Sequence, residues 1–216
     1  PQGEGPWAGT ASLFIRTSGC NLRCWFCDTP YTSWEPEGEQ QSLEQLRAVV
    51  EQSAVEHVVI TGGEPMLAAQ LTELTEICRA AGRVITIETA GTVDRSVECD
   101  LMAISPKRPN SAPQDEHWRV RHEQTRHQPA VVRSLLERYD CILKFVIDDE
   151  ADVADVCAYV EEIGDVRAEQ VWLMAQARTK EQLAARSGWV QAAADEQGFR
   201  YSPRLHVELH GDARGV

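Results

Sequence analysis

Residues 20–27 of the chain read Cys-Asn-Leu-Arg-Cys-Trp-Phe-Cys and place three cysteines within eight positions. The apolar, partly β-branched run at 12–16 is closed by Ser18 and Gly19, so it predicts a strand that leads into the cysteine segment. Seven cysteines in all is an odd number, which leaves at least one unpaired in any disulfide scheme. Three thiols in one short loop favour an inorganic ligand in a reducing compartment over a disulfide framework.

The rest of the chain alternates predicted strands with predicted helices. Apolar runs predict strands, and apolar residues three and four positions apart predict helices. The strands are expected at 12–16, 58–60, 84–87, 101–105, 142–147 and 171–174, and the helices at 42–54, 71–81, 130–139, 153–160 and 180–196. Five or six such units predict an α/β fold with a mostly parallel sheet, a partial (β/α)6-type barrel whose functional side chains gather at the carboxyl ends of the strands.

The length of 216 residues and the 43% hydrophobic content predict one domain over residues 1–216. Because the chain begins at Pro1 and not at methionine, we expect further residues, among them a strand, to precede it. The segment 107–128 is polar and proline-containing, and it predicts a long loop or lid. Its three histidines are spaced five apart and share no helix face, so they are predicted to be solvated: His117, His122 and His127.

Charge and hydropathy limit the classes of partner. The chain has 21 Lys and Arg against 34 Asp and Glu, a net charge of -13, which disfavours nucleic acid as a partner. No apolar run approaches the roughly 20 residues that cross a bilayer, and no signal peptide is recognisable. We therefore expect a cytoplasmic protein without a membrane partner.

The three cysteines of the loop suit an iron–sulfur cluster. A [4Fe-4S] cluster has four irons, so Cys20, Cys24 and Cys27 would leave one iron free to chelate a small molecule. Zinc is the alternative, but a structural zinc site is closed and needs a fourth ligand. The four remaining cysteines are interpreted as packing residues of the core: Cys78, Cys99, Cys141 and Cys157.

A second motif, Thr-Gly-Gly-Glu-Pro at 61–65, directly follows a predicted strand. Its two glycines allow the backbone to approach a ligand closely, and Glu64 can accept a hydrogen bond from an ammonium group. A simple strand-to-helix turn is the alternative reading of this motif alone. The cysteine spacing with Phe26 before the last cysteine, taken with this second motif, resembles the radical S-adenosylmethionine (SAM) superfamily.

A narrower resemblance extends over nearly the whole chain. The segments Gln-Gly-Glu-Gly at 2–5 and Cys-Asp-Thr at 27–29 resemble the 7-carboxy-7-deazaguanine synthase family. The match continues at 61–65, 88–92, 105–107 and 205–216. A radical SAM activase that acts on a partner protein would share the cysteine spacing, but nothing in that class calls for the segments 2–5 and 27–29. A zinc-stabilised binding module is the non-enzyme alternative.

The resemblance implies an enzyme, a carbon–nitrogen lyase. In that family 6-carboxy-5,6,7,8-tetrahydropterin is contracted to 7-carboxy-7-deazaguanine with release of ammonia, on the route to queuosine and related 7-deazapurines. The implied cofactors are a [4Fe-4S] cluster, SAM and Mg²⁺, with an electron donor such as flavodoxin or ferredoxin, and the implied assembly is a homodimer. The cluster and the SAM radical carry the chemistry, and no further catalytic residue is implied.

Site residues carry over by position. The resemblance implies that substrate contacts come from Gln2, Gly3, Glu4, Arg16, Thr61, His206 and the terminal carboxylate of Val216. A planar guanidinium such as that of Arg16 can pair with a substrate carboxylate. SAM contacts are implied at Phe26, Cys27, Asp28, Gly62, Gly63, Glu64, Glu88, Ser105, Pro106, Lys107, Met174, Ala175 and Gln176, although proline and an acid are common in the family at the last two positions. Thr29 is implied as a ligand of Mg²⁺, which prefers oxygen donors.

Overall fold

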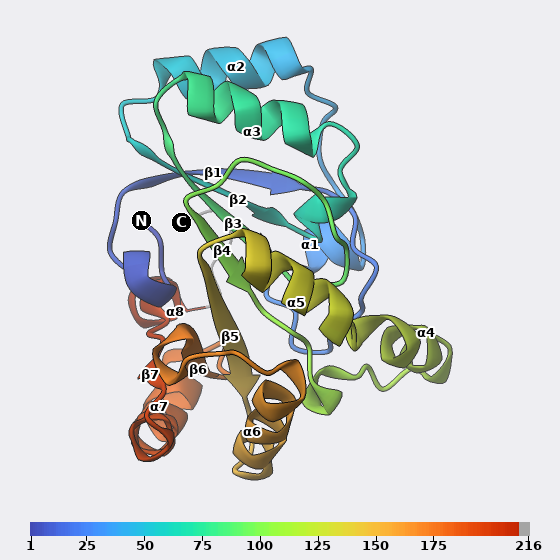
Figure 1. Ribbon diagram of the computed structural model, residues 1–216, viewed down its shortest axis with the longest axis vertical. Helices are drawn as coiled ribbons and strands as arrows, with labels where there is room; N and C mark the ends of the chain where they lie inside the picture. Colours follow the sequence, from blue (N-terminus) through green and yellow to red (C-terminus); the bar gives the residue numbers. More distant parts are fainter. Residues whose placement is uncertain (212–216) are drawn as a thin grey trace.

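A seven-stranded parallel sheet forms the centre of the computed structural model, which describes residues 1–211. Each strand pairs with the next one along the chain, in the order β1 to β7, as a partial barrel requires (Figure 1). The predicted α/β class with a mostly parallel sheet is confirmed. The strands are β1 Ser12–Thr17, β2 His57–Gly62, β3 Val84–Thr89, β4 Leu101–Ile104, β5 Cys141–Ile147, β6 Val171–Ala175 and β7 Arg200–Tyr201.

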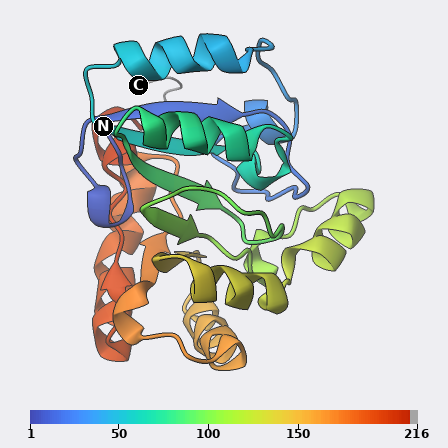
Figure 2. The ribbon, with the colours of Figure 1, turned by 45° about the horizontal axis from the view of Figure 1, so that its top comes forward.

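Helices cover the convex face of the sheet and connect its strands, except β3 and β4, which are joined by a loop (Figures 1 and 2). The α-helices are α1 Pro30–Ser33, α2 Leu43–Gln52, α3 Leu71–Ala80, α4 Glu116–Arg126, α5 Pro129–Arg138, α6 Ala151–Ile163, α7 Lys180–Gln197 and α8 Leu205–His210. Short 3-10 turns lie at η1 Gly5–Trp7, η2 Pro65–Leu67, η3 Pro109–Ser111 and η4 Ala168–Gln170. Helix α2 begins with the predicted capping box, in which the side chains of Ser42 and Gln45 exchange hydrogen bonds with each other's backbone.

Alternation along the strands gives the sheet two different faces. On the convex face, Ile60, Ile87 and Phe145 are fully buried and join the core that the helices complete. The residues next to them in sequence, Thr61, Glu88 and Lys144, line a cavity on the concave face. The same strands therefore build the apolar core and present polar groups to the cavity.

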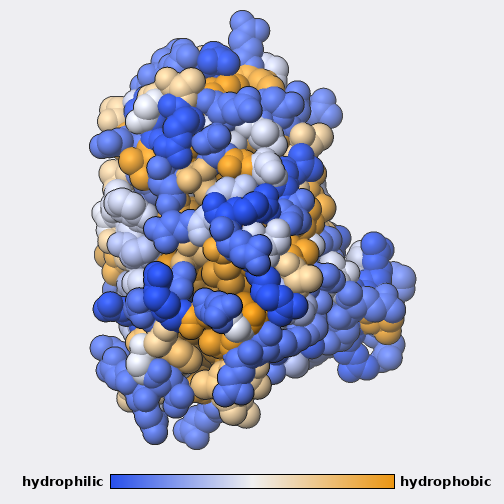
Figure 3. Space-filling view, viewed as in Figure 1, coloured by the Kyte–Doolittle hydropathy of each residue, from blue (hydrophilic) through white to orange (hydrophobic). Residues whose placement is uncertain are grey.

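The prediction of a loop over 107–128 is wrong for its central part, which forms α4. The helix is capped by Asp115, whose carboxylate accepts a hydrogen bond from the backbone N–H of Trp118 at 3.0 Å. Few residues of α4 are apolar, so no apolar stripe announced it. It projects from the body as a mostly hydrophilic lobe, seen at the right of Figure 3. His122 on this helix is 1% exposed, which corrects the prediction that it is solvated.

Two smaller expectations have mixed outcomes. Cys78 and Cys141 are buried, as predicted, whereas Cys157 is half-buried beside Gln197 and is not part of the core. The short elements α1, α8 and β7 were not predicted, because two to six residues are too few for a periodic pattern. None of the helices in the described part of the chain has the length and apolar character to cross a membrane.

Gly91, in the turn after β3, offers a test of how tightly this end of the sheet packs. Gly91 and Gly82 share a φ of 69°, where any side chain is strained. A Cβ at Gly91 would lie 2.7 Å from Ile104 Cγ2 and 3.0 Å from Val132 Cγ2, whereas a Cβ at Gly82 meets nothing within 4 Å. We expect Gly82→Ala to lower the free energy of unfolding by about 1–2 kcal/mol, and Gly91→Ala to cost about 1–3 kcal/mol more through overpacking. Urea denaturation measures both, and equal losses would contradict the tight contact.

Candidate functional site

A cavity of about 780 Å³ lies over the concave face of the sheet, where the strands end. Six strands contribute to its lining, β1 through β6, together with the cysteine loop, the first residues of the chain and α8. Most of the predicted site residues line it: Gln2, Gly3, Glu4, Arg16, Cys20, Cys24, Phe26, Cys27, Asp28, Thr29, Thr61, Gly62, Gly63, Glu88, Ser105, Lys107, Met174, Gln176 and His206. Glu64, Pro106 and Ala175 do not line it, and Val216 lies outside the described residues.

The three cysteines of the loop line this cavity, and burial shifts the pKa of two of them. Burial raises the pKa of Cys24 to about 12, and burial also raises the pKa of Cys20. The ammonium group of Lys107 acts in the opposite direction on both thiols. A metal centre that displaces the thiol protons would remove this burial penalty.

The spacing of the cysteines argues against a single zinc ion. The three cysteine sulfurs do not all lie within 4.8 Å of one another. Among residues 1–211, the one group of potential metal ligands that does meet this distance contains no cysteine. Sulfurs bound to one tetrahedral zinc at 2.3 Å would lie about 3.8 Å apart. The three thiols are more widely spread than that, and thiol-only donors around a shared space fit a four-iron cluster.

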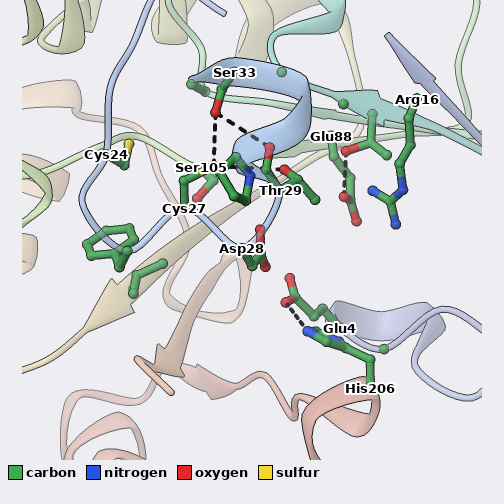
Figure 4. Close-up of a pocket in the computed structure, with 18 of the residues that line it drawn as sticks. Glu4, Arg16, Cys24, Cys27, Asp28, Thr29, Ser33, Glu88, Ser105 and His206 are labelled. Atoms are coloured by element: carbon green, nitrogen blue, oxygen red, sulfur yellow. Dashed lines mark hydrogen bonds and ion pairs between the residues drawn. The ribbon is translucent and has the colours of Figure 1, made fainter. Parts of the chain in front are cut away.

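Helix α1 brings hydroxyl groups to Cys27. Cys27 Sγ lies 3.2 Å from Ser33 Oγ and 3.9 Å from Thr29 Oγ1 (Figure 4). Thr29 is the residue that precedes α1, and Ser33 is one turn further on. Ser33 could not be predicted, because a serine in a four-residue helix carries no recognisable signal.

The two glycines at the end of β2 permit a close contact between backbones. A Cβ at Gly62 would lie 2.1 Å from the carbonyl oxygen of Thr17, and a Cβ at Gly63 would lie 2.1 Å from that of Gly19. The N–H groups of Gly63 and Glu64 donate to these two carbonyls, at 3.0 and 2.9 Å. The glycines therefore hold the Thr-Gly-Gly-Glu-Pro loop against the start of the cysteine loop.

Glu64 is buried behind the cavity and does not line it. Its carboxylate accepts hydrogen bonds from Thr89 Oγ1 at 2.7 Å, from the N–H of Ala90 at 2.8 Å and from the N–H of Met66 at 3.0 Å. Burial raises the pKa of Glu64, and these hydrogen bonds oppose the shift. Its carboxylate therefore joins the ends of β2 and β3 behind the lining of the cavity, and its contact with the ammonium group of SAM stays a prediction.

Glu88 lies among the predicted substrate contacts. It accepts hydrogen bonds from Gln2 Nε2 at 2.9 Å and from Thr61 Oγ1 at 3.0 Å. Gln2 in turn accepts the backbone N–H of Gly3 at 2.7 Å and that of Glu4 at 3.2 Å. This network ties the N-terminal segment to β2 and β3 on the side of the cavity opposite the cysteines (Figure 4).

Glu4 is surrounded by cations from two distant parts of the chain. Its carboxylate pairs with Lys144 Nζ, lies 3.4 Å from Arg204 Nε and lies 3.8 Å from His206 Nε2. Burial would raise the pKa of Glu4, but the charges of Lys144 and Arg204 outweigh it and hold the pKa well below its usual range. Burial lowers the pKa of Lys144, and Glu4 and Glu88 reverse this, so that the net shift is upward. The pair is therefore ionised.

Arg204 extends this charge network to the cysteine loop. It donates to Asp28 Oδ2 at 2.9 Å and to the carbonyl oxygen of Ala177. Ligand atoms of Glu4, Asp28 and His206 lie within 4.8 Å of one another. Because Arg204 and Lys144 already neutralise these carboxylates, the three side chains are poorly suited to hold a metal ion.

Gly3 lets the two ends of the described chain meet at the cavity. A Cβ at this position would lie 2.4 Å from His206 Nδ1. The carbonyl oxygen of Gly3 accepts the N–H of Leu205 at 2.9 Å, so α8 is held against the N-terminal segment. Figure 1 shows α8 beside η1, although the two elements are separated by nearly the whole sequence.

Two cations at the cavity differ in how they are partnered. Lys107 Nζ donates to the side chain of Ser105 at 2.6 Å and to its carbonyl oxygen at 3.0 Å. The guanidinium of Arg16 lies 5.0 Å from the ring centre of Phe14, and no carboxylate of residues 1–211 lies within 4 Å of it. Arg16 is therefore a cation of the lining that is placed to receive an anionic group.

Local sequence patterns did not single out Lys144 and Arg204, the two lining cations that contact Glu4. Lys144 is the single charged residue in the otherwise apolar strand β5, and a lysine in such a run is a signal that could have been used. Arg204 follows β7 in an irregular segment, where nothing in the local sequence predicts that it reaches Asp28 and Glu4.

Comparisons with known proteins agree with this geometry. A profile of the Radical SAM superfamily matches residues 14–127. The 7-carboxy-7-deazaguanine synthase of Rhodopirellula baltica is 43% identical over 219 residues, which span 100% of this chain and 85% of that protein. The 7-carboxy-7-deazaguanine synthase of Halobacterium salinarum is 43% identical over 225 residues, which span 98% of this chain and 88% of that protein.

Solved structures share the fold at lower identity. The crystal structure of QueE from Escherichia coli matches with a TM-score of 0.67 at 21% identity, and the match covers 93% of this chain and 88% of that one. Streptococcus suis SuiB bound to its precursor peptide SuiA matches with a TM-score of 0.61 at 13% identity, over 89% of this chain and 48% of that one. By its full-length sequence relatives, the chain belongs to the radical SAM superfamily and, within it, to the 7-carboxy-7-deazaguanine synthase family.

Proposed function

We propose that the protein contracts 6-carboxy-5,6,7,8-tetrahydropterin to 7-carboxy-7-deazaguanine with release of ammonia, in a pathway to queuosine or a related 7-deazapurine. The observation that carries the proposal is a single cavity with three thiols on one side and the ionised Glu4 and available Arg16 on the other. Superfamily membership implies a [4Fe-4S] cluster and SAM. A radical SAM activase is not favoured, because relatives that match the whole chain are synthases.

The residues present fit the cluster. Cys20, Cys24 and Cys27 would hold three irons and leave the fourth open toward the cavity. When bound, the cluster and SAM supply the one-electron chemistry that removes a hydrogen atom from the substrate. The chain contributes position and charge: we assign SAM contacts to Phe26, Asp28, Gly62, Gly63, Ser105, Lys107, Met174 and Gln176, which line the cavity.

Complementary charges orient the substrate in this proposal. Arg16 pairs with the carboxylate of the pterin, and Glu4 accepts N–H groups from its amino-pyrimidine edge. An ionised carboxylate accepts more strongly than a protonated one, and the cations around Glu4 keep it ionised. Gln2, Thr61 and Glu88 form the adjoining wall, with Gly3 and His206 beside Glu4. The carboxylate of Val216 remains a proposed contact.

Three further features follow the family. We assign Thr29 to Mg²⁺, since it lines the cavity next to Asp28 and a single oxygen ligand suits an ion that keeps most of its waters. The electron donor is a small redox protein such as flavodoxin or ferredoxin. The working assembly is a homodimer in the cytoplasm.

The activity itself is tested by anaerobic reconstitution. Protein loaded with iron and sulfide, reduced with dithionite and given SAM, Mg²⁺ and the tetrahydropterin should form 7-carboxy-7-deazaguanine, measured by mass spectrometry. SAM should be recovered, because the family regenerates it. Cys24→Ala should bind little iron and form no product, while Cys157→Ala, a half-buried cysteine away from the loop, should behave as wild type. Loaded wild-type protein that forms no product would overturn the proposal.

The ionised state of Glu4 is tested by a double-variant comparison. Lys144→Met removes a cation from a buried carboxylate, so it should lower the free energy of unfolding at pH 7 by roughly 3 kcal/mol. Adding Glu4→Gln removes the carboxylate charge that has lost its lysine, while Arg204 keeps Asp28 as its partner, so it should restore part of this loss, as measured by urea denaturation. If the double variant loses the sum of both single losses, the two residues are not coupled as the structure indicates.

The magnesium assignment is tested at Thr29. Thr29→Val removes the hydroxyl at nearly constant volume, so the Mg²⁺ concentration for half-maximal activity should rise roughly tenfold. Thr29→Ser keeps the hydroxyl and should stay near wild type. Turnover titrated with Mg²⁺ gives both values, and an unchanged requirement in Thr29→Val would exclude the residue as a ligand.

A further inference from the structure

The buried His122 is used by no part of the proposed reaction, yet it contacts the cysteine loop directly. Its Nδ1 accepts the backbone N–H of Arg23 at 3.1 Å, and its Nε2 lies 2.8 Å from Ser111 Oγ. Both His122 and Ser111 are almost fully buried. The ring therefore joins the segment after β4 to the residue that precedes Cys24.

The hydrogen bonds define which nitrogen of His122 carries the proton. A backbone N–H can only donate, so Nδ1 is the acceptor and the proton lies on Nε2, which donates to Ser111 Oγ. The hydroxyl of Ser111 then donates to the carbonyl oxygen of Arg108 at 2.6 Å. Burial lowers the pKa of His122 to about 4, in keeping with a neutral ring at pH 7. In this series of hydrogen bonds, both ring nitrogens of His122 and the hydroxyl of Ser111 have partners.

The same segment also holds the residue that follows Cys24. The backbone N–H of Trp25 donates to the carbonyl oxygen of Ser111 at 3.2 Å, and its indole Nε1 donates to that of Asn110 at 2.7 Å. Cys24 is thus flanked on both sides by residues bonded to the segment 107–128. Of the three cysteines in the loop, Cys24 is buried and the other two are half-buried.

Aromatic rings on α4 and just after α1 hold the side chain of Arg23. Its guanidinium lies 4.5 Å from the ring centre of Trp118 and 5.9 Å from that of Trp34. It also donates to the carbonyl oxygens of Cys20 and Leu22, at 2.8 and 2.7 Å. Arg23 therefore connects the backbone of the cysteine loop to α4 by a second, independent set of contacts.

We propose that His122 is a positioning residue for the cysteine loop: by accepting the N–H of Arg23 while anchored to Ser111, it holds Cys24 in the conformation that a cluster ligand needs. The helix α4 is then a rigid support for the loop and not a mobile lid. The inference rests on the cluster assigned under the proposed function, but its structural part concerns the protein without the cluster. The two parts can be measured separately.

The test uses two substitutions of His122, each of which keeps one of the two hydrogen bonds that the ring makes. Asn carries an oxygen near the place of Nδ1 and can still accept from Arg23, whereas Gln reaches the place of Nε2 and leaves Arg23 without an acceptor. Hydrogen exchange of the segment 20–27 in the cluster-free protein reports the bond to Arg23. Iron and sulfide per chain after anaerobic reconstitution report the consequence for the cluster.

We expect His122→Gln to speed exchange at Arg23 at least tenfold and to lower the iron content. His122→Asn keeps the acceptor for Arg23 but loses the bond to Ser111, so it should change both readouts clearly less. The exposed His117 on the same helix gives matched controls, since His117→Gln and His117→Asn carry the same helix propensities and should change neither readout. Ser111→Ala, which removes the anchor of the ring and keeps the backbone, should reproduce the faster exchange of 20–27 if His122→Gln fails to fold.

Two results would overturn the proposal. One is unchanged exchange of 20–27 in both His122→Gln and Ser111→Ala. The other is faster exchange spread evenly over the whole chain, which would make His122 an ordinary core residue. Failure of the proposed function looks different, because wild-type protein would then load no iron, or load it and form no product, while the exchange pattern of the variants still separated Asn from Gln.

Discussion

The position of the cysteine loop depends on one close contact between two backbone segments, in which residues 62–64 lie directly against residues 17–19. The N–H groups of Gly63 and Glu64 donate to the carbonyls of Thr17 and Gly19, and the glycines leave no room for a side chain between the segments. This contact continues the parallel pairing of β1 with β2 beyond the ends of both strands. It places the start of the cysteine loop over the end of the sheet, so the cysteines face the cavity.

Buried charge organises the opposite side of the cavity. A carboxylate that is taken out of water costs free energy unless cations accompany it. Glu4 meets this condition through Lys144 from the middle of β5 and Arg204 from the end of the chain. Because Arg204 also bonds Asp28, next to Cys27, the charge network reaches the cysteine loop. Arg204 therefore links the residues proposed to bind the substrate to the loop that carries the three cysteines.

Long regular elements could be predicted because burial imposes a period on the sequence. The strands β1 to β6 contain apolar runs, and the helices α2, α3, α5, α6 and α7 carry apolar residues three and four positions apart. Their predicted positions agree with the structure to within a few residues. Helix α4 could not be found in this way, since it is held by Trp118, His122 and Arg126 and not by an apolar stripe. The roles of Glu64 and Glu88 depend on which side chains surround them, and no local pattern contains that information.

The sequence alone determined the parallel α/β class, the three-cysteine loop at the end of the first strand and the glycine turn that follows the second. Each of these is a local property, written in residue type, period and spacing. Only the tertiary structure decided that Lys144 and Arg204 hold Glu4 ionised, that Glu64 bonds β3 behind the cavity and that His122 supports the loop. The physical reason is that hydrogen bonds and ion pairs act over a few ångströms in space, and their partners here are 25 to 200 residues apart along the chain.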